Sequence, residues 1–526
     1  MLFTSFEFIL FTVLLIAVYY IVPMRFRWML LLACSILFYA FAGLSGFLFM
    51  GITIVTSYAA ARLIERVYTR QDAYLSSDEG KALSRDDKKI YKAKCKRQAR
   101  AFLVPALVIN FGILALLKYI LVGKILDSIP LLSGAALVLP MGISFYTFQT
   151  MGYLIDVYRA KAHAEKNIFK AALFTSFFPL LVQGPISDYK YLSKTLYTPE
   201  PFSGKNLLFG LERVLWGYFK KLVIADRLLA AVTAIIGSPS AYTGAYALFG
   251  MILYAAQLYA DFTGGIDITI GIAEMLGIRV QENFNRPYFS KNITEYWRRW
   301  HISLGEWFKE YLFYPISVSK PMLKLSKKAR GALGDAVGKR VPVYISTIAV
   351  WLTTGIWHGR GWNFVVWGLG NCVIILISQE LSPLYDRFHK RLPGIGRTAL
   401  YKSFACLRTI FILSSLRMLD CYRNVPLTFK MFAGIFTKGK YADLIRGGFL
   451  ELGLTKADFI VAALGIAVIF TVSMIQRKGS IRARLDARPS GLQMQAALCA
   501  ILIIAILIFG AYGIGYDQSQ FIYNQF

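Results

Sequence analysis

Long apolar runs separated by short polar segments dominate the chain. Their lengths suit helices that cross a bilayer. They lie at residues 6–22, 28–45, 47–64, 102–122, 134–155, 206–229, 243–260, 341–357, 361–378, 403–418, 457–475 and 493–512. Two shorter runs, 168–185 and 262–279, are typical of re-entrant or partly buried segments. The pattern predicts an all-α integral membrane protein of about eleven to thirteen helices at membrane depth, forming one multi-pass domain over residues 1–526.

Composition agrees with this pattern and narrows the class of protein. Hydrophobic residues make up 56% of the chain, charged residues only 17%, and the mean hydropathy is +0.51. Such a chain cannot build a water-soluble surface, and it is too apolar to be disordered. The net charge of +29 would suggest nucleic acid in a soluble protein. Here the basic residues cluster between apolar runs, so we expect membrane lipids and no nucleic acid as partners.

The basic clusters also predict the orientation of the chain. Cytoplasmic loops carry an excess of Lys and Arg, which places the clusters within 62–100, 286–340 and 477–488 in the cytoplasm. The first apolar run lacks a basic segment before it and a cleavage site after it, so we expect it to remain as a membrane helix. The tail 513–526 contains neither Lys nor Arg and is predicted to be extracytoplasmic.

Signatures of soluble enzymes and of metal sites are missing from the sequence. There is no phosphate loop, dinucleotide fingerprint, HExxH or GxSxG. The six cysteines form no CxxC pair, and the four histidines are not spaced as metal ligands. We therefore expect no metal, and any chemistry must be carried by single histidines within longer motifs.

His358 lies at the junction of two apolar runs, in the segment Gly355-Ile-Trp357-His358-Gly359. An ionisable side chain near membrane depth is costly unless it faces the protein interior or a water-filled cavity. Flanking glycines permit close backbone approach, and imidazole suits proton transfer near neutral pH. These residues alone leave two interpretations open: a catalytic base, or an interfacial histidine in an aromatic belt.

His301 lies in a segment whose periodicity predicts one amphipathic helix from Asn292 to Tyr311, with Asn292 as its cap. Trp297 and Trp300 fall on its apolar face, Arg298 falls on its polar face, and His301 lies at the wet boundary between them. An interfacial anchor and a functional histidine both fit this pattern.

Asp261 and Asp267 follow an apolar run and flank a pair of glycines. They could line a polar cavity or bind a substrate hydroxyl. Structural ion pairing, with an arginine such as Arg286, is favoured because unpaired carboxylates are penalised at membrane depth.

Four motifs within the core region 250–370 carry a resemblance to a known family. They are Ala260-Asp261-Phe262-Thr263-Gly264, Glu282-Asn283-Phe284-Asn285-Arg286-Pro287-Tyr288, Trp297-Arg298-Arg299-Trp300-His301-Ile302-Ser303-Leu304 and Gly355-Ile356-Trp357-His358-Gly359. With these motifs the chain resembles the membrane-bound O-acyltransferase family, and within it the bacterial alginate O-acetyltransferase type. The sequence departs from the family pattern in two places: Trp367-Gly368 is followed by Leu369-Gly370-Asn371, where the family often has another His-Gly, and the tail has Asn524.

The resemblance implies a ring of helices around a funnel or tunnel, with His358 and His301 as catalytic residues. It also implies that the region around them lines the substrate path; the candidates are Asp261, Asp267, Asn283, Arg286, Trp297, Arg298, Trp300 and Trp357. The implied reaction moves an acetyl group from a cytoplasmic thioester, either acetyl-CoA or an acyl carrier protein, across a bacterial cell membrane. No resident cofactor is implied. The recipient would be an extracytoplasmic transferase or a polysaccharide.

Three further hypotheses remain open at this stage. The chain could transfer D-alanine to teichoic acid, although its length favours acetylation. It could instead be a proton-coupled transporter or flippase for a glycan precursor. Within the acetylation hypothesis, Tyr523 is a candidate to receive the acyl group transiently on the outer face.

Overall fold

The computed structural model describes residues 3–41, 43, 45–120 and 140–512, and these are overwhelmingly helical. No β-strand occurs in this part of the chain, although a single-residue antiparallel bridge joins Phe284 to Trp300. The predicted all-α class is therefore confirmed. The chain forms two compact units, Met1–Gly210 with Thr269–Gln281, and Leu211–Ile268 with Glu282–Phe526.

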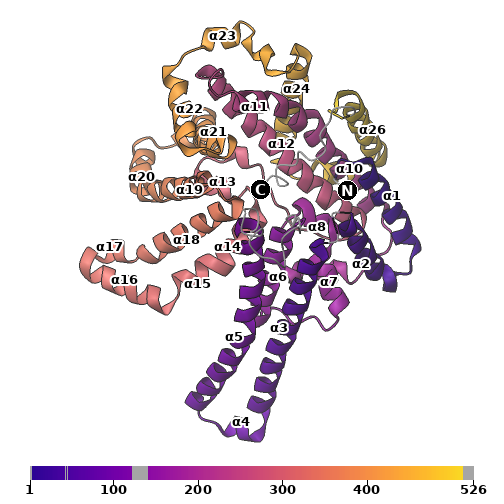
Figure 1. Ribbon diagram of the computed structural model, residues 1–526, viewed down its shortest axis with the longest axis vertical. Coiled ribbons are helices and arrows are strands. Elements are labelled where there is room, and N and C mark those ends of the chain that lie inside the picture. Colours follow the sequence, from indigo (N-terminus) through magenta and orange to yellow (C-terminus); the bar gives the residue numbers. More distant parts are fainter. Residues whose placement is uncertain (1–2, 42, 44, 121–139, 513–526) are drawn as a thin grey trace, which may run out of the picture. The chain divides into compact units, whose positions relative to one another are not determined.

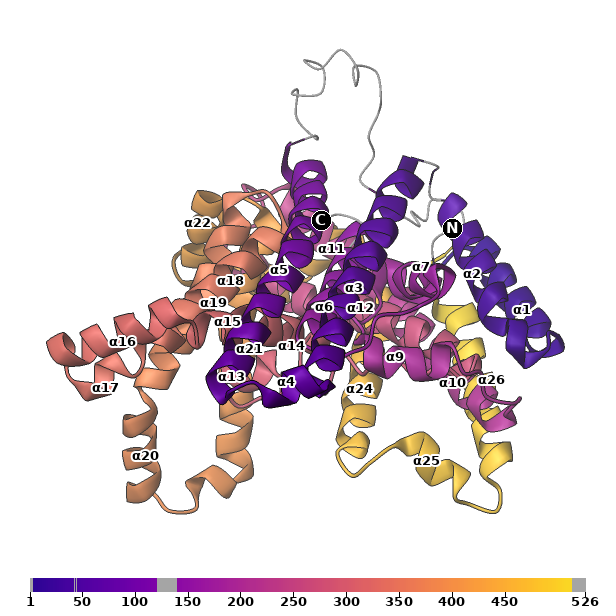
Figure 2. The same cartoon turned by 90° about the horizontal axis from the view of Figure 1, so that it is seen from below.

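Two long helices, α3 (Ser45–Ser76) and α5 (Arg85–Ala115), dominate the first unit and lie side by side, joined by α4 (Asp78–Ala82) (Figures 1 and 2). At 1.5 Å per residue each is about 47 Å long, well beyond the roughly 30 Å hydrocarbon core. The basic segment 62–100 is thus mostly helical rather than a loop, because Lys and Arg are good helix formers.

The remaining helices of the first unit are shorter. They are α1 (Phe6–Ile21), α2 (Met24–Ala40), α6 (Ile143–Tyr158), α7 (Ile168–Ser176), α8 (Phe178–Gln183) and α9 (Tyr189–Leu196). The apolar run 168–185 is broken at Phe177, and Pro179 stands in the first turn of α8, where its missing N–H costs no helix bond. The short apolar run 168–185 is thus a broken and largely buried segment, as its length predicts.

The second unit contains the motifs of interest. Its main helices are α10 (Gly204–Tyr218), α11 (Asp226–Gly237), α12 (Ala245–Met275), α18 (Val341–His358), α19 (Trp362–Glu380), α21 (Ala399–Tyr422), α22 (Val425–Thr437), α24 (Lys456–Gln476) and α26 (Gly491–Phe509). The ends of α10 and α12 contribute to the first unit. A π-helical segment, η3 (Phe219–Ala225), joins α10 to α11.

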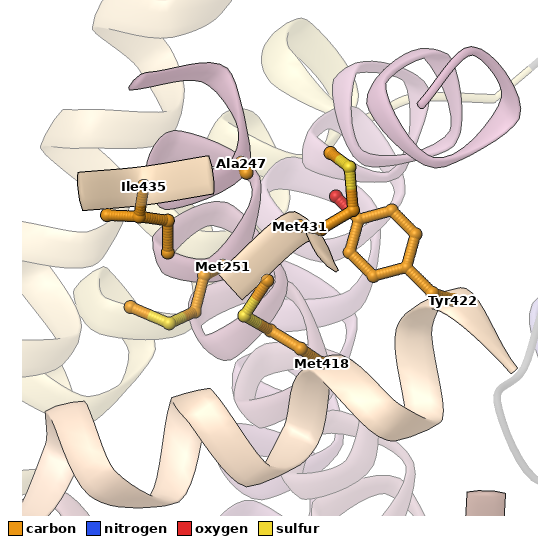
Figure 3. Packing of buried hydrophobic residues seen from close by; sticks show 6 residues of the cluster. All are labelled: Ala247, Met251, Met418, Tyr422, Met431 and Ile435. Carbon is orange, nitrogen blue, oxygen red and sulfur yellow. The ribbon is translucent and has the colours of Figure 1, made fainter. Parts of the chain in front are cut away.

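Figure 3 shows a buried cluster that ties α12, α21 and α22 together. Met251 of α12, Met418 of α21 and Met431 of α22 lie at its centre. Unbranched, polarizable methionine side chains fill irregular gaps between helices. This packing fixes α21 beside α12, which matters for the site because each helix carries buried polar groups.

Five helices among the described residues are long and apolar enough to cross a membrane, namely α3, α5, α19, α24 and α26. The chain is a membrane protein; the count of eleven to thirteen helices and the central funnel stay predictions. Two boundaries were wrong. The runs 243–260 and 262–279 form the single helix α12, and the run 206–229 is divided among α10, η3 and α11. Tyr523, the tail 513–526 and the start of the run 134–155 lie outside the described residues.

Candidate active site

Helices α18 and α19 pack unusually closely, and this packing sets the position of His358. A Cβ on Gly355 would lie 2.5 Å from the Phe364 carbonyl oxygen, and one on Gly368 would lie 2.4 Å from the Trp351 carbonyl oxygen. Both glycines are therefore required for the backbones to touch. The close approach brings the end of α18 against the side chains of α19.

The imidazole of His358 lies between two indoles. Its ring centroid is 4.7 Å from that of Trp367 and 5.0 Å from that of Trp357, both in edge-to-face geometry. His358 is 7% exposed, and Trp367 is 1% exposed. The histidine is thus buried in an aromatic environment, rather than placed in a solvent-facing aromatic belt.

His301 is not inside a continuous helix, contrary to the helix predicted from Asn292 to Tyr311. Instead α13 (Ile293–Trp297) and α14 (Ile302–Phe308) are separated by a turn, and His301 adopts a left-handed φ of 50° as the cap of α14. The predicted cap at Asn292 is confirmed, since its side chain accepts from the Glu295 amide.

Backbone pairing explains this break in the helix. The Asn285 amide donates to the Arg299 carbonyl over 2.9 Å, and the Ile302 amide donates to the Asn283 carbonyl over 3.0 Å. These two bonds fasten the motif at 282–288 to the motif at 297–304. Periodicity cannot reveal such a tertiary pairing, and a left-handed non-glycine residue persists only where its surroundings determine it.

Asn283 fixes the tautomer of His301. Its Oδ1 accepts from the Ser303 amide at 3.0 Å and from the Ser303 hydroxyl at 2.9 Å, which identifies that atom as the oxygen. The His301 Nδ1 lies 3.4 Å from the same oxygen and must therefore donate, leaving Nε2 as the acceptor nitrogen. Burial, with a smaller effect from Arg417, lowers the pKa of His301 to about 3. The imidazole is neutral at physiological pH.

The two histidines share one neighbour, Trp357. The His301 ring centroid is 6.0 Å from that of Trp357, which is directly followed by His358. Phe262 of the first motif packs edge-to-face on His301 at 5.1 Å. Residues from four separate motifs therefore meet in one buried cluster. His301 is 4% exposed, so its predicted position at a wet boundary was wrong.

Arg417 on α21 belongs to the same cluster, although no recognisable motif surrounds it in the chain. Its guanidinium carbon lies 4.9, 5.5 and 5.8 Å from the ring centroids of Trp367, Trp300 and Trp297, respectively. Asp420 accepts from Arg417 at 3.4 Å and from the Tyr254 hydroxyl at 2.9 Å. The available signal was an Arg and an Asp three positions apart at the end of an apolar run, a rare placement at membrane depth.

Asn371, where the sequence departs from the family pattern, supports this cluster. Its Oδ1 accepts from the Trp297 indole N–H at 3.1 Å, and its Nδ2 donates to the Trp367 carbonyl at 2.9 Å. The side chain is fully buried. Its Oδ1 therefore holds the Trp297 indole beside Arg417, while its Nδ2 bonds the main chain of α19 one turn earlier.

The two carboxylates predicted near the site are engaged in ion pairs. Lys221 lies 2.5 Å from Asp261 and 2.7 Å from Asp226, and Asp267 lies 2.5 Å from Lys220 and 2.9 Å from Arg213. Structural ion pairing is thus confirmed.

The proposed partner, Arg286, was wrong. The actual cations come from α10 and η3, whose lysines stood unremarked inside an apolar run. Arg286 is half-buried at the edge of a cavity, and Arg298 is exposed. Within the ranges that the structure describes, no group of three or more His, Cys, Asp or Glu side chains is placed to hold a metal ion.

The chain is similar in sequence to a known family and to several known proteins. A sequence model of the membrane-bound O-acyltransferase family matches residues 158–332. The chain is 30% identical over 476 residues to "Probable alginate O-acetylase" of Azotobacter vinelandii, covering 87% of this chain and 82% of that protein. It is 29% identical over 354 residues to the peptidoglycan O-acetyltransferase of Helicobacter pylori, covering 61% and 64%. It is 28% identical over 267 residues to the teichoic acid D-alanyltransferase of Bacillus subtilis, covering 48% and 62%.

Proposed function

This chain belongs to the membrane-bound O-acyltransferase family, and on that premise we propose that it transfers an acetyl group from a cytoplasmic thioester to a hydroxyl of a cell-surface or secreted polysaccharide. Family membership makes it an acyltransferase, which disfavours the transporter hypothesis. The observation that carries the proposal is that the rings of His301 and His358 both contact the indole of Trp357. A buried pair of imidazoles suits proton transfer in a water-poor site.

In this proposal His358 is the general base. Its imidazole takes the proton of the acceptor hydroxyl while the hydroxyl oxygen attacks the thioester carbonyl carbon. The resulting tetrahedral intermediate collapses, the carbon–sulfur bond breaks, and the thiolate takes the proton from the imidazolium. The products are an O-acetyl ester and a free thiol. His301, with Nε2 as an acceptor nitrogen, accepts a hydrogen bond from the acceptor and orients it.

Asn283 is a candidate donor to the developing oxyanion. Its Oδ1 is committed to Ser303 and His301, while its Nδ2 is buried and has no hydrogen-bond partner among the described residues. A buried donor without a partner is costly, so such groups in native proteins call for an explanation. A substrate oxyanion would supply the missing acceptor, and Arg417 adds a fixed positive charge in the same cluster.

The donor and the recipient complete the proposal. We propose acetyl-CoA or an acetylated carrier protein as donor, and an extracytoplasmic transferase or the polysaccharide itself as recipient. The location is the bacterial cell membrane, with basic loops in the cytoplasm. Tyr523 remains a candidate acyl relay: Tyr523→Phe should abolish acetylation of the polysaccharide if the hydroxyl carries the group, and normal acetylation contradicts the relay.

The direct test is formation of an acyl ester by the purified chain. Membranes or nanodiscs that contain the protein are incubated with labelled acetyl thioester, or with D-alanyl carrier protein, together with a polysaccharide acceptor. Ester-linked acetyl on the acceptor supports the proposal. Ester-linked D-alanine, without acetyl, would instead identify the teichoic acid activity named for the Bacillus subtilis relative.

A further inference from the structure

The second unit contains a cavity of about 1120 Å³ that the proposed chemistry does not use. Helices α12, α21 and α24, labelled in Figure 1, line it together with the segment between Arg286 and Arg299. Its volume is slightly above the range of roughly 300 to 1,000 Å³ that is typical of small-molecule sites. The cavity is therefore large enough for a ligand with an extended chain.

The cavity lining becomes more polar toward the C-terminal end of α24 and α12 and toward the N-terminal end of α21, which runs antiparallel to them. On α24 the lining runs from Ile466 to Arg477, and on α21 it runs from Phe411 to Lys402. On α12 it runs from Leu248 to Tyr259. One end of the cavity is thus apolar and the other end is polar, which is the distribution that an amphiphile requires.

The polar end has a strong positive excess. Five cations line the cavity, Arg286, Lys291, Arg299, Lys402 and Arg477, against one carboxylate. That carboxylate, Glu295, pairs with Arg299 at 2.6 Å, so the other four cations face the cavity without a carboxylate in its lining. Such a cluster favours a phosphate group.

The apolar part has the length of one membrane leaflet. Ile466 and Arg477 are eleven residues apart on one helix, which corresponds to about 17 Å along its axis. Half of the hydrocarbon core is about 15 Å. The positive-inside rule places the basic segments 286–340 and 477–488 on the cytoplasmic side, so the basic end lies at the level of the inner-leaflet headgroups.

We propose that this cavity binds an anionic phospholipid of the cytoplasmic leaflet, with its phosphate among the cations and an acyl chain along α24. Basic pockets between membrane helices are known to hold anionic lipid headgroups. An acetyl thioester fits less well, because a two-carbon acyl group leaves the apolar wall uncovered.

The lipid would also support the candidate active site. Tyr259 and Tyr288 line the cavity, and their ring centroids lie 6.4 and 6.3 Å from that of Trp300, the residue before His301. The Tyr288 hydroxyl donates to the Ala255 carbonyl at 2.7 Å, across the cavity lining. Occupancy should therefore hold the 286–300 segment in place. The effect of the lipid on the active site rests on the proposed function, whereas the lipid-binding site does not.

Lipid retention by the full chain in detergent tests the binding site. Native mass spectrometry counts the phosphatidylglycerol and phosphatidylcholine that stay bound after delipidation and exchange. We expect selective retention of one phosphatidylglycerol, reduced at least tenfold in the Lys402→Gln/Arg477→Gln variant. Lys328→Gln, an exposed cation outside the cavity, should retain it. Ala256→Phe, which places an aromatic ring in the cavity, should weaken retention without removing a charge.

Several results would overturn the proposal. These are equal retention of both lipids, full retention by the double variant, displacement of the lipid by inorganic phosphate alone, or displacement by acetyl-CoA. The last result would assign the cavity to the acyl donor.

Activity in nanodiscs tests the consequence separately. With phosphatidylglycerol present, acetyl transfer should be several-fold faster than in phosphatidylcholine alone, and the double variant should lose this difference. Equal rates of acetyl transfer in both lipids, with the lipid still retained, would contradict the idea that the lipid supports the active site. They would not contradict the lipid-binding site itself. Absence of acetyl transfer in every lipid would contradict the proposed function, while the retention result would still decide the lipid site.

Discussion

The histidine cluster and the buried ion pairs are both polar features of the second unit, yet they are held in opposite ways. Lys221 has carboxylates at 2.5 and 2.7 Å, whereas His358 has indole ring centroids at 4.7 and 5.0 Å. Paired charges satisfy one another and hold their helices together. An imidazole packed against indole rings is fixed in position but can still exchange a proton. Ion pairs therefore mark the structural polar groups here, while ring contacts accompany the groups that we propose to carry the chemistry.

Phe262 connects the two features, since it follows Asp261 in sequence and packs on His301. A single motif thus serves both: its carboxylate anchors α12 to η3, and its ring supports the histidine. Substitutions can separate the two roles. Those in the histidine cluster should change the rate of acetyl transfer while the fold stays intact, and those in the ion pairs should change the free energy of unfolding.

The largest expected effect is that of His358→Ala on the rate. Loss of a general base should lower the rate of acetyl transfer by about 10²- to 10⁴-fold, while the midpoint of thermal unfolding stays within a few degrees of the wild type. The measurement is ester formation per folded molecule. His389→Ala is the matched control, because His389 is exposed on α20 (Ser382–Arg391). A normal rate in His358→Ala would falsify the assignment of the base.

Lys221→Met should have the opposite effect to His358→Ala, because it should lower the stability of the fold. It removes the cation that Asp226 and Asp261 share, and breaking a buried ion pair costs about 3 to 5 kcal/mol in the free energy of unfolding. Thermal unfolding in one detergent measures this loss, with Lys328→Met as an exposed control. Adding Asp226→Asn and Asp261→Asn should restore much of the stability. If Lys221→Met were as stable as the wild type, the ion pairs would not be structural.

The membrane fold and both histidines could be predicted from the sequence because their signals are local. Apolar length predicts a helix in lipid, and the motif around His358 is continuous in the chain. Arg417, Lys220 and Lys221 were missed because their importance depends on partners that are distant in sequence. The break at His301 was missed for the same reason, since it is imposed by bonds to Asn283 and Asn285, about sixteen residues earlier.

Asn283→Asp tests the histidine cluster without changing the shape of a side chain, because Asp and Asn are nearly isosteric but differ in hydrogen-bonding groups and charge. The carboxylate keeps the oxygen that accepts from Ser303 but lacks the Nδ2 donor. Loss of one oxyanion donor should lower kcat by about 10²- to 10³-fold, with a smaller effect on KM. Asn371→Asp, an equally buried amide that binds two indole-bearing residues, controls for the added charge. Equal losses of kcat in both variants would show that buried charge, and not the missing donor, is responsible.

The smallest expected effect is a pH dependence of stability that comes from His301. Its pKa of about 3 lies below the ordinary value of 6.5, so between these values the unfolded chain holds a proton that the folded chain does not. The free energy of unfolding should therefore fall as the pH drops below about 6.5, by roughly 1 kcal/mol at pH 6, and stay level above pH 7.5. Thermal unfolding between pH 8 and pH 5.5 measures this slope. His301→Gln cannot take up the proton and should lose its share of the slope; an unchanged slope in that variant would mean that His301 is charged in the folded protein, and the orientation role that requires its acceptor nitrogen would fail with it.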